Sequence, residues 1–218
     1  MYTNVNLAAP IGALALLGTG LILFICIVVL VESMLVRKRG RAKFVAVAIL
    51  AITVLYSSAM LIFSLVSHDK LLARGEEKHF CELDCHLAYS IVNTQQASSI
   101  GQGAGRLVAQ GQFTVVTIQT RFDGMTIAPW RGNGLLSPNG RVVALTDQTG
   151  HRYGPVGQTG TPLTTPLRPG ESYTTDIAFN LPADAKPTTL LINEDAWETR
   201  LVIGHENSLL HGQTRFQI

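Results

Sequence analysis

The chain has 218 residues, a formal net charge of +2 and 47% hydrophobic residues, a length that fits one or two domains. Apolar residues are concentrated in the first third, and the remainder is rich in Gly, Thr and Pro. The single basic cluster is short and the total charge is near neutral, which argues against a nucleic-acid partner.

Two apolar runs flank the basic cluster. The first, from Pro10 to Val36, holds one charged residue, Glu32, and the second, from Phe44 to Ser67, holds none. A bilayer core takes about 20 apolar residues in a helix, so we predict transmembrane helices at about 10–36 and 44–67. The turn between them, 37–43, carries five cations: Arg37, Lys38, Arg39, Arg41 and Lys43.

This charge pattern predicts the orientation. Short basic loops stay on the cytoplasmic side, so the turn is predicted to be cytoplasmic, and the N-terminus and the C-terminal domain periplasmic. The location would be a bacterial inner membrane. No basic segment precedes the first run, which argues against a cleaved signal peptide. We expect Glu32 to pair with Arg37 or Lys38.

Small residues in both runs predict close helix packing. Gly12, Gly18 and Gly20 lie in the first run, and the second is rich in Ala and Ser. Small residues let helix backbones approach closely in lipid. We expect the two helices to pack as a hairpin and to leave a small-residue face for a membrane partner.

After the second run the chain becomes polar. Residues 68–79 are predicted to be a helix extension and linker, and 80–218 a periplasmic domain. Its segments alternate apolar and polar residues as strands do, and turn signals separate them. The predicted strands are 85–92, 113–122, 141–145, 172–179, 188–192, 199–203 and 214–218. About seven short strands predict an antiparallel β-sandwich, with 92–112 and 129–138 as loops.

The densest group of reactive side chains is a Cys/His cluster: His79, Cys81, Cys85 and His86. Exported cysteines form disulfides, so we expect Cys81 and Cys85 to be joined within a turned segment and to bind no cofactor. Free packed thiols, or a zinc, copper or haem site on the four residues, remain alternatives. The C-x3-C spacing resembles the binuclear copper loop of oxidase subunit II, but Tyr89 stands at a ligand position. It also departs from the C-x-x-C-H haem signature by one residue.

No catalytic motif supports an enzyme. The sequence has no G-x-S-x-G elbow, P-loop or dinucleotide fingerprint. His205 to Asn207 and His211 are expected in a polar turn between two strands, before a packed Leu-Leu pair. Trp and Arg are frequent interface anchors, so Trp130, Arg131 and Trp197 are candidate partner contacts.

Four segments carry a family resemblance: FCELDCHLAYSIV, RVVALTDQTGHRYGP, LRPGESYTTDIAFNLP and TRLVIGHENSLLH. Together they resemble an immunoglobulin-like bacterial domain of unknown function, displayed outside the membrane behind a short anchor. The likeness covers roughly residues 80–218 and implies a binding or structural module without catalytic residues. The architecture also resembles small accessory subunits of photosynthetic reaction-centre and respiratory complexes.

These observations predict a two-helix transmembrane hairpin carrying an all-β, immunoglobulin-like sandwich. We expect a non-catalytic accessory subunit without cofactors, which stabilises a membrane electron-transfer complex, photosynthetic or respiratory. Its partners would be the other subunits and the lipid bilayer. The alternatives are a metal- or haem-binding redox carrier at the Cys/His cluster, and a free-standing envelope binding protein.

Overall fold

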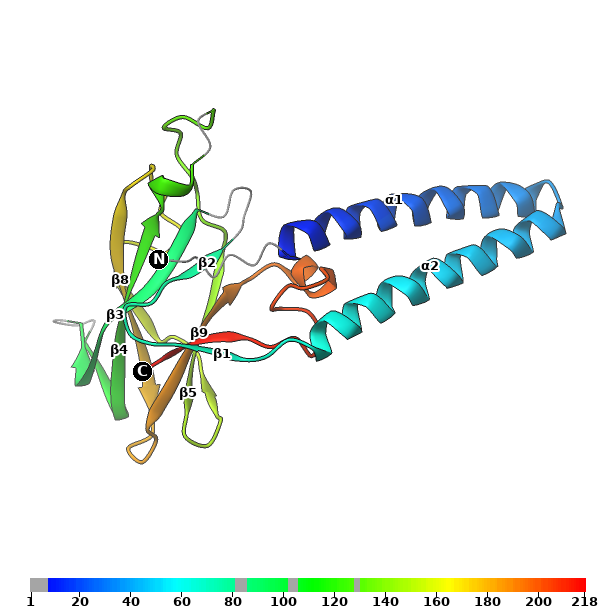
Figure 1. Cartoon of the computed structure of the whole chain (residues 1–218). Coiled ribbons are helices and arrows are strands. Elements are labelled where there is room, and N and C mark those ends of the chain that lie inside the picture. Colours follow the sequence, from blue (N-terminus) through cyan, green and yellow to red (C-terminus); the bar gives the residue numbers. More distant parts are fainter. Residues whose placement is uncertain (1–7, 81–85, 102–105, 128–129) are drawn as a thin grey trace. The chain divides into compact units, whose positions relative to one another are not determined.

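Two long helices, α1 (Ala8–Leu35) and α2 (Arg39–Leu65), pack on each other as an antiparallel hairpin in the computed structural model (Figure 1). The structure describes residues 8–80, 86–101, 106–127 and 130–218. Both helices are long and apolar enough to cross a membrane. Their large apolar side chains stay mostly exposed, in contrast to those of a helix in a soluble core.

The turn between the helices is tighter than the sequence predicted. α1 ends in a Schellman motif, in which Lys38 N–H donates to Ser33 C=O (2.9 Å) and Arg37 N–H donates to Met34 C=O (3.1 Å). Arg37 occupies the left-handed position of this motif, with φ +57°. α2 therefore begins at Arg39, and not after residue 43, because Arg and Lys are good helix formers.

The ion pair of Glu32 also differs from the prediction. Its carboxylate lies 3.3 Å from the guanidinium of Arg41, which sits on the facing first turn of α2. The sequence pointed to Arg37 or Lys38 instead. Both side chains are about half exposed, so the pair adds little stability.

The described residues include ten strands, which form a β-sandwich of two five-stranded sheets, as the sequence predicted in outline (Figure 1). The order in the first sheet is β1 (Lys70–Leu72), β10 (Thr214–Gln217), β9 (Pro187–Glu194), β5 (Arg141–Asp147) and β6 (Arg152–Tyr153). The order in the second is β2 (Lys78–Phe80), β3 (Leu87–Ile100), β4 (Leu107–Phe122), β8 (Ser172–Leu181) and β7 (Gly157–Gly160). β1 and β10 run parallel, and every other pair is antiparallel.

The core of the sandwich comes from both sheets. Alternate side chains of a strand point to one face, and the inward ones are the apolar residues that the sequence pattern singled out. The largest fully buried side chains include Tyr89, Phe122, Phe179 and Phe216. Their burial supplies the main favourable term for folding this domain.

Two segments predicted to be a linker and a loop are strands. Residues 68–79 contain β1 and most of β2, and β1 is held by pairing with β10 at the far end of the chain. The described parts of 92–112 lengthen β3 and β4, which pair from Leu87–Phe122 to Ile100–Leu107. Most residues of these extensions are polar, and the apolar ones, such as Leu107 and Val108, do not alternate with polar residues. The pattern that indicates a strand is therefore missing.

The predicted strand 199–203 is wrong. Trp197–Leu201 is a 3-10 helix, followed by a series of turns. The chain divides into two compact units, and Trp197–Gly212 belongs to the unit of the helices up to His68. Asp69–Ala196 and Gln213–Ile218 form the sandwich unit. The sequence pattern of 199–203 fits a strand, but contacts with the helices decide its conformation.

Candidate functional site

A charged cluster lies where β2 meets β3 and β4. Glu77 binds the Arg121 guanidinium through both carboxylate oxygens, at 2.7 Å and 2.8 Å. The same guanidinium lies 3.3 Å from an Asp123 carboxylate oxygen. On the other side of Glu77, His79 Nε2 lies 3.4 Å from a carboxylate oxygen.

The cluster changes the ionisation of its members. The hydrogen bonds from Arg121 hold the pKa of Glu77 below its ordinary value. Burial lowers the pKa of His79 and outweighs the attraction of Glu77, so this imidazole is neutral at neutral pH. Burial alone would raise the pKa of Asp123, but the Met125 N–H and Arg121 bring it below the ordinary value. The cluster is thus a fixed ion-pair network beside a neutral histidine.

This arrangement offers little chemistry by itself. The side chain of His79 is only 4% exposed, and its Nδ1 has no hydrogen-bond partner. Within the described residues, no group of three or more His, Cys, Asp and Glu side chains is arranged to hold a metal ion. Cys81 and Cys85 lie outside the described residues, so their disulfide, and the metal or haem alternative, stay predictions.

Two buried cations nearby were not predicted from the sequence. The ammonium group of Lys78 donates to the carbonyls of Ile192 (2.7 Å) and Thr214 (3.0 Å) and lies 5.0 Å from the Phe80 ring centroid. The Arg141 guanidinium lies 4.2 Å from the centroid of that ring. Lys78 lies in a segment that the sequence predicted to be a linker. The burial of Lys78 follows from β2, which was not predicted. Both cations tie β2 to the opposite sheet and thereby stabilise the sandwich.

The other predicted site residues of the sandwich differ in exposure. His86 is buried and stacks on Phe122, with ring centroids 5.4 Å apart. The Arg131 guanidinium lies 4.8 Å from the centroid of the Phe122 ring, so it packs within the domain and is less available to a partner. Trp130, directly before it, is 88% exposed and is the better candidate contact of the two.

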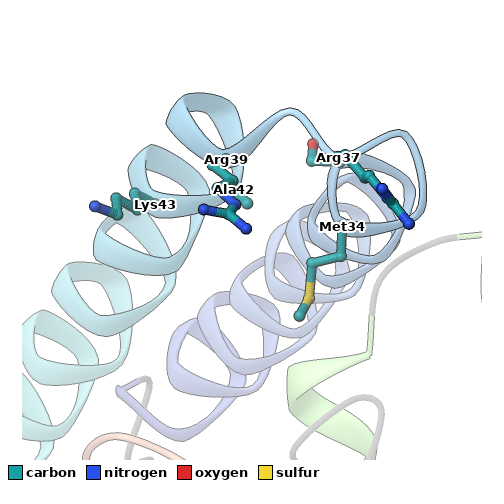
Figure 2. A pocket seen from close by; sticks show the side chains of 6 residues that line it. Met34, Arg37, Arg39, Ala42 and Lys43 are labelled. Carbon is teal, nitrogen blue, oxygen red and sulfur yellow. The ribbon is translucent and has the colours of Figure 1, made fainter.

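The hairpin turn encloses a basic hollow of about 640 Å³ (Figure 2). Figure 2 shows Arg37 and Met34 on the α1 side and Arg39 and Lys43 on the α2 side. The complete lining is Ser33, Met34, Arg37, Arg39, Ala42 and Lys43. Three cations around one hollow attract anions, and phospholipid headgroups are the anions nearest to such a turn at a membrane surface.

The segment Trp197–Gly212, here called the capping segment, contacts both helices. Tyr56 of α2 donates its hydroxyl proton to the Leu201 carbonyl at 2.7 Å. Gly212 N–H donates to Ser67 Oγ at 2.6 Å. On α1, a Cβ at Gly12 would lie 2.0 Å from the Ile203 carbonyl oxygen, so this contact requires a glycine.

The predicted roles of this segment therefore change. Leu209 and Leu210 are not a packed pair, because they are 63% and 65% exposed. His205 lies in a turn as expected, with its Nδ1 accepting from Asn207 N–H at 3.0 Å, but the turn does not join two strands. Trp197 is 66% exposed and belongs to the helical unit.

Comparison with known proteins finds two solved structures of low similarity and does not identify a family. No family model and no curated protein matches the sequence. The secreted protein MPT63 of Mycobacterium tuberculosis is similar, with 13% identity, a TM-score of 0.45, and coverage of 69% of this chain and 98% of that one. An uncharacterized β-sandwich protein of Clostridium difficile 630 gives 10% identity, a TM-score of 0.42, and coverage of 70% and 95%.

Proposed function

We propose that the chain is a two-pass membrane protein whose periplasmic sandwich acts by contact, as a non-catalytic accessory subunit of a larger membrane complex. The observation that carries this is the exposure of the two long apolar helices. In water, surfaces such as those around Leu14 and Leu55, more than 70% exposed, would be strongly unfavourable, whereas in lipid they are the expected surface.

Two open glycine positions on α1 support the proposal of a helical partner. No atom lies within 4 Å of a Cβ placed at Gly18 or Gly20, so α2 does not use these positions. The two glycines are about 200° apart around the helix and open different faces. At either position the backbone of another helix can approach closely. The exposed Trp130 offers a second contact, on the sandwich.

The proposed identity of the complex rests on the resemblance of the chain's architecture to that of accessory subunits. On that basis we propose an electron-transfer complex, photosynthetic or respiratory, in a bacterial inner membrane. The Cys81/Cys85 cluster keeps a redox carrier as the alternative, and a free-standing envelope protein is the other. Absorption spectroscopy and metal analysis of the purified chain test the redox alternative.

Strand order supports an immunoglobulin-like type for the sandwich. That fold places strands A, B, E and D in one sheet and G, F and C in the other. Reading β4 as B and β5 as C gives β3-β4-β8-β7 and β10-β9-β5, which follow both orders. The departure is β1, which pairs with β10 before the chain enters β2 and β3. An experimental structure would test this assignment.

Co-purification tests the accessory role. A tagged full-length chain, extracted in mild detergent, is expected to bring down a defined set of membrane subunits. Gly18→Leu fills the open face and is expected to reduce the yield of complex, with an unchanged electron-transfer rate per assembled complex. Val54→Leu, which adds one methylene group at an exposed α2 position, is the control. An unchanged yield with a collapsed rate would contradict a contact role and favour the redox carrier.

A further inference from the structure

The capping segment runs from the level of Ser67, just past the end of α2, towards the middle of the two helices. Its contact Tyr56 is nine residues before Leu65, the end of α2, which is roughly 14 Å at about 1.5 Å per residue. Its contact Gly12 is four residues after Ala8, where described α1 begins, or roughly 6 Å. Such depths correspond to the boundary between headgroups and acyl chains for helices that span a bilayer.

Its backbone is suited to that depth. Four successive turns close at three-residue spacing, as N–H groups of Val202, His205, Ser208 and His211 donate to Thr199, Val202, His205 and Ser208. The carbonyls of Leu201 and Val202 also accept from the side chains of Tyr56 and Ser208. These pairings reduce the cost of placing backbone polar groups at the interface, next to apolar lipid.

The outer surface of the segment is apolar where it is most exposed. Trp197, Leu209 and Leu210 are each more than 60% exposed. The helices that the segment contacts also expose large apolar side chains, while Glu198 and Arg200 supply polar groups that can reach water. Trp is enriched at the membrane interface because its ring is apolar and its N–H is polar.

We propose that the capping segment is an interfacial membrane element, which buries Trp197, Leu209 and Leu210 among the phospholipids of the periplasmic leaflet. The inference rests on the proposed membrane anchoring and extends it. The occupant of this apolar surface is lipid, because the segment contacts α1 at Gly12 and α2 at Tyr56, within the apolar helices proposed to span the bilayer. The segment thus places the membrane boundary on a part of the chain that joins β9 to β10.

Tryptophan quenching tests the proposal directly, because the chain has only two tryptophans. Trp130→Phe leaves Trp197 as the single reporter, and Trp197→Phe leaves Trp130 as its matched control. Each full-length variant is reconstituted into phosphatidylcholine–phosphatidylglycerol vesicles and recovered by flotation. The lipids carry bromine either near the glycerol end of the acyl chains or near their terminal methyl.

The expected result is a blue-shifted Trp197 emission that loses more intensity to shallow bromine than to deep bromine, with little loss for Trp130. Flotation without quenching of Trp197 would overturn the interfacial element and leave membrane anchoring intact. Failure to float would overturn both. Quenching of Trp197 that appears only on dilution with excess lipid would also overturn the proposal, because a second copy would then be the occupant.

Discussion

At the scale of single residues, Asp147 shows how one carboxylate fixes a turn of the sandwich. One of its oxygens accepts from Thr149 N–H, Thr149 Oγ1 and His151 N–H, and the other accepts from the Tyr153 hydroxyl. These bonds favour the ionised form and lower the pKa of Asp147 from 3.8 to about 2. The turn between β5 and β6 therefore depends on a charged side chain.

Asp147→Asn is expected to destabilise the sandwich at neutral pH, because the amide accepts fewer and weaker hydrogen bonds. A lowered pKa stabilises the folded state above the ordinary value of 3.8, and this contribution disappears as the pH falls through about 2. The difference between the two proteins should therefore shrink as the pH falls from above 3.8 towards 2. Urea midpoints of the full-length chain in mild detergent, followed by far-UV circular dichroism, measure it.

Asp184→Asn is the control for this comparison. Asp184 is exposed, and in the contact the structure gives it, its backbone carbonyl, not its carboxylate, accepts from Gln148 at 3.2 Å. Its replacement is expected to leave the urea midpoint nearly unchanged. A gap for Asp147→Asn that stays constant down to acid pH would show that the ionised carboxylate is not what stabilises the turn.

At the scale of elements, the capping segment depends on the absence of one methyl group. A Cβ at Gly12 would meet the Ile203 carbonyl oxygen at 2.0 Å and Val202 Cγ1 at 3.0 Å. The carbonyl belongs to the backbone and cannot rotate away as a flexible side chain can. Either the segment or the helix must shift to admit a larger residue.

Gly12→Ala is accordingly expected to loosen the capping segment. Overpacking of this kind costs about 1–3 kcal/mol, which corresponds to roughly five- to 150-fold faster amide exchange in the segment. Hydrogen–deuterium exchange with mass spectrometry of the peptides covering 197–212 measures this. Gly18→Ala adds the same methyl where no atom lies within 4 Å, so its exchange should match the parent chain. Equal exchange in both variants would contradict the contact.

Sequence patterns predicted those elements whose conformation is decided locally. β4 and β8 show strand alternation because one face is buried, and the two helices follow from length and apolarity. β1 was missed because it has three residues and pairs with a strand more than 140 positions away. The capping segment was misread because TRLVI has a strand pattern, while its turns are held by Gly12 and Tyr56.

The sequence predicted some residues of the candidate site but not which side chains contact one another there. The His79–His86 cluster drew attention to the right end of the sandwich. The Glu77–Arg121 pair and the buried Lys78 join residues distant in sequence, and nothing in their local sequence marks the partners. Trp130 is exposed, whereas Arg131 packs on Phe122. Their adjacent positions in the sequence could not reveal this difference.

At the scale of the whole molecule, charge is distributed unevenly along the membrane unit. All five cations of 37–43 lie at the hairpin turn, and three of them surround the basic hollow. α1 begins and α2 ends away from the turn. If both helices span the membrane, the chain before α1 and the chain after α2 lie on the side opposite the turn. On the positive-inside rule we propose that the turn is cytoplasmic and the sandwich periplasmic.

Thiol labelling tests this orientation in intact cells. Gly40→Cys places a thiol in the first turn of α2, where no atom lies within 4 Å of the new Cβ, and Gly134→Cys places one in an open loop of the sandwich. A membrane-impermeant maleimide is expected to label Gly134→Cys in intact cells and Gly40→Cys only after permeabilisation, above the background of the parent chain with its three cysteines. The reverse pattern would place the turn in the periplasm. Labelling of both in intact cells would contradict a membrane-spanning hairpin, because no bilayer would then separate the two positions.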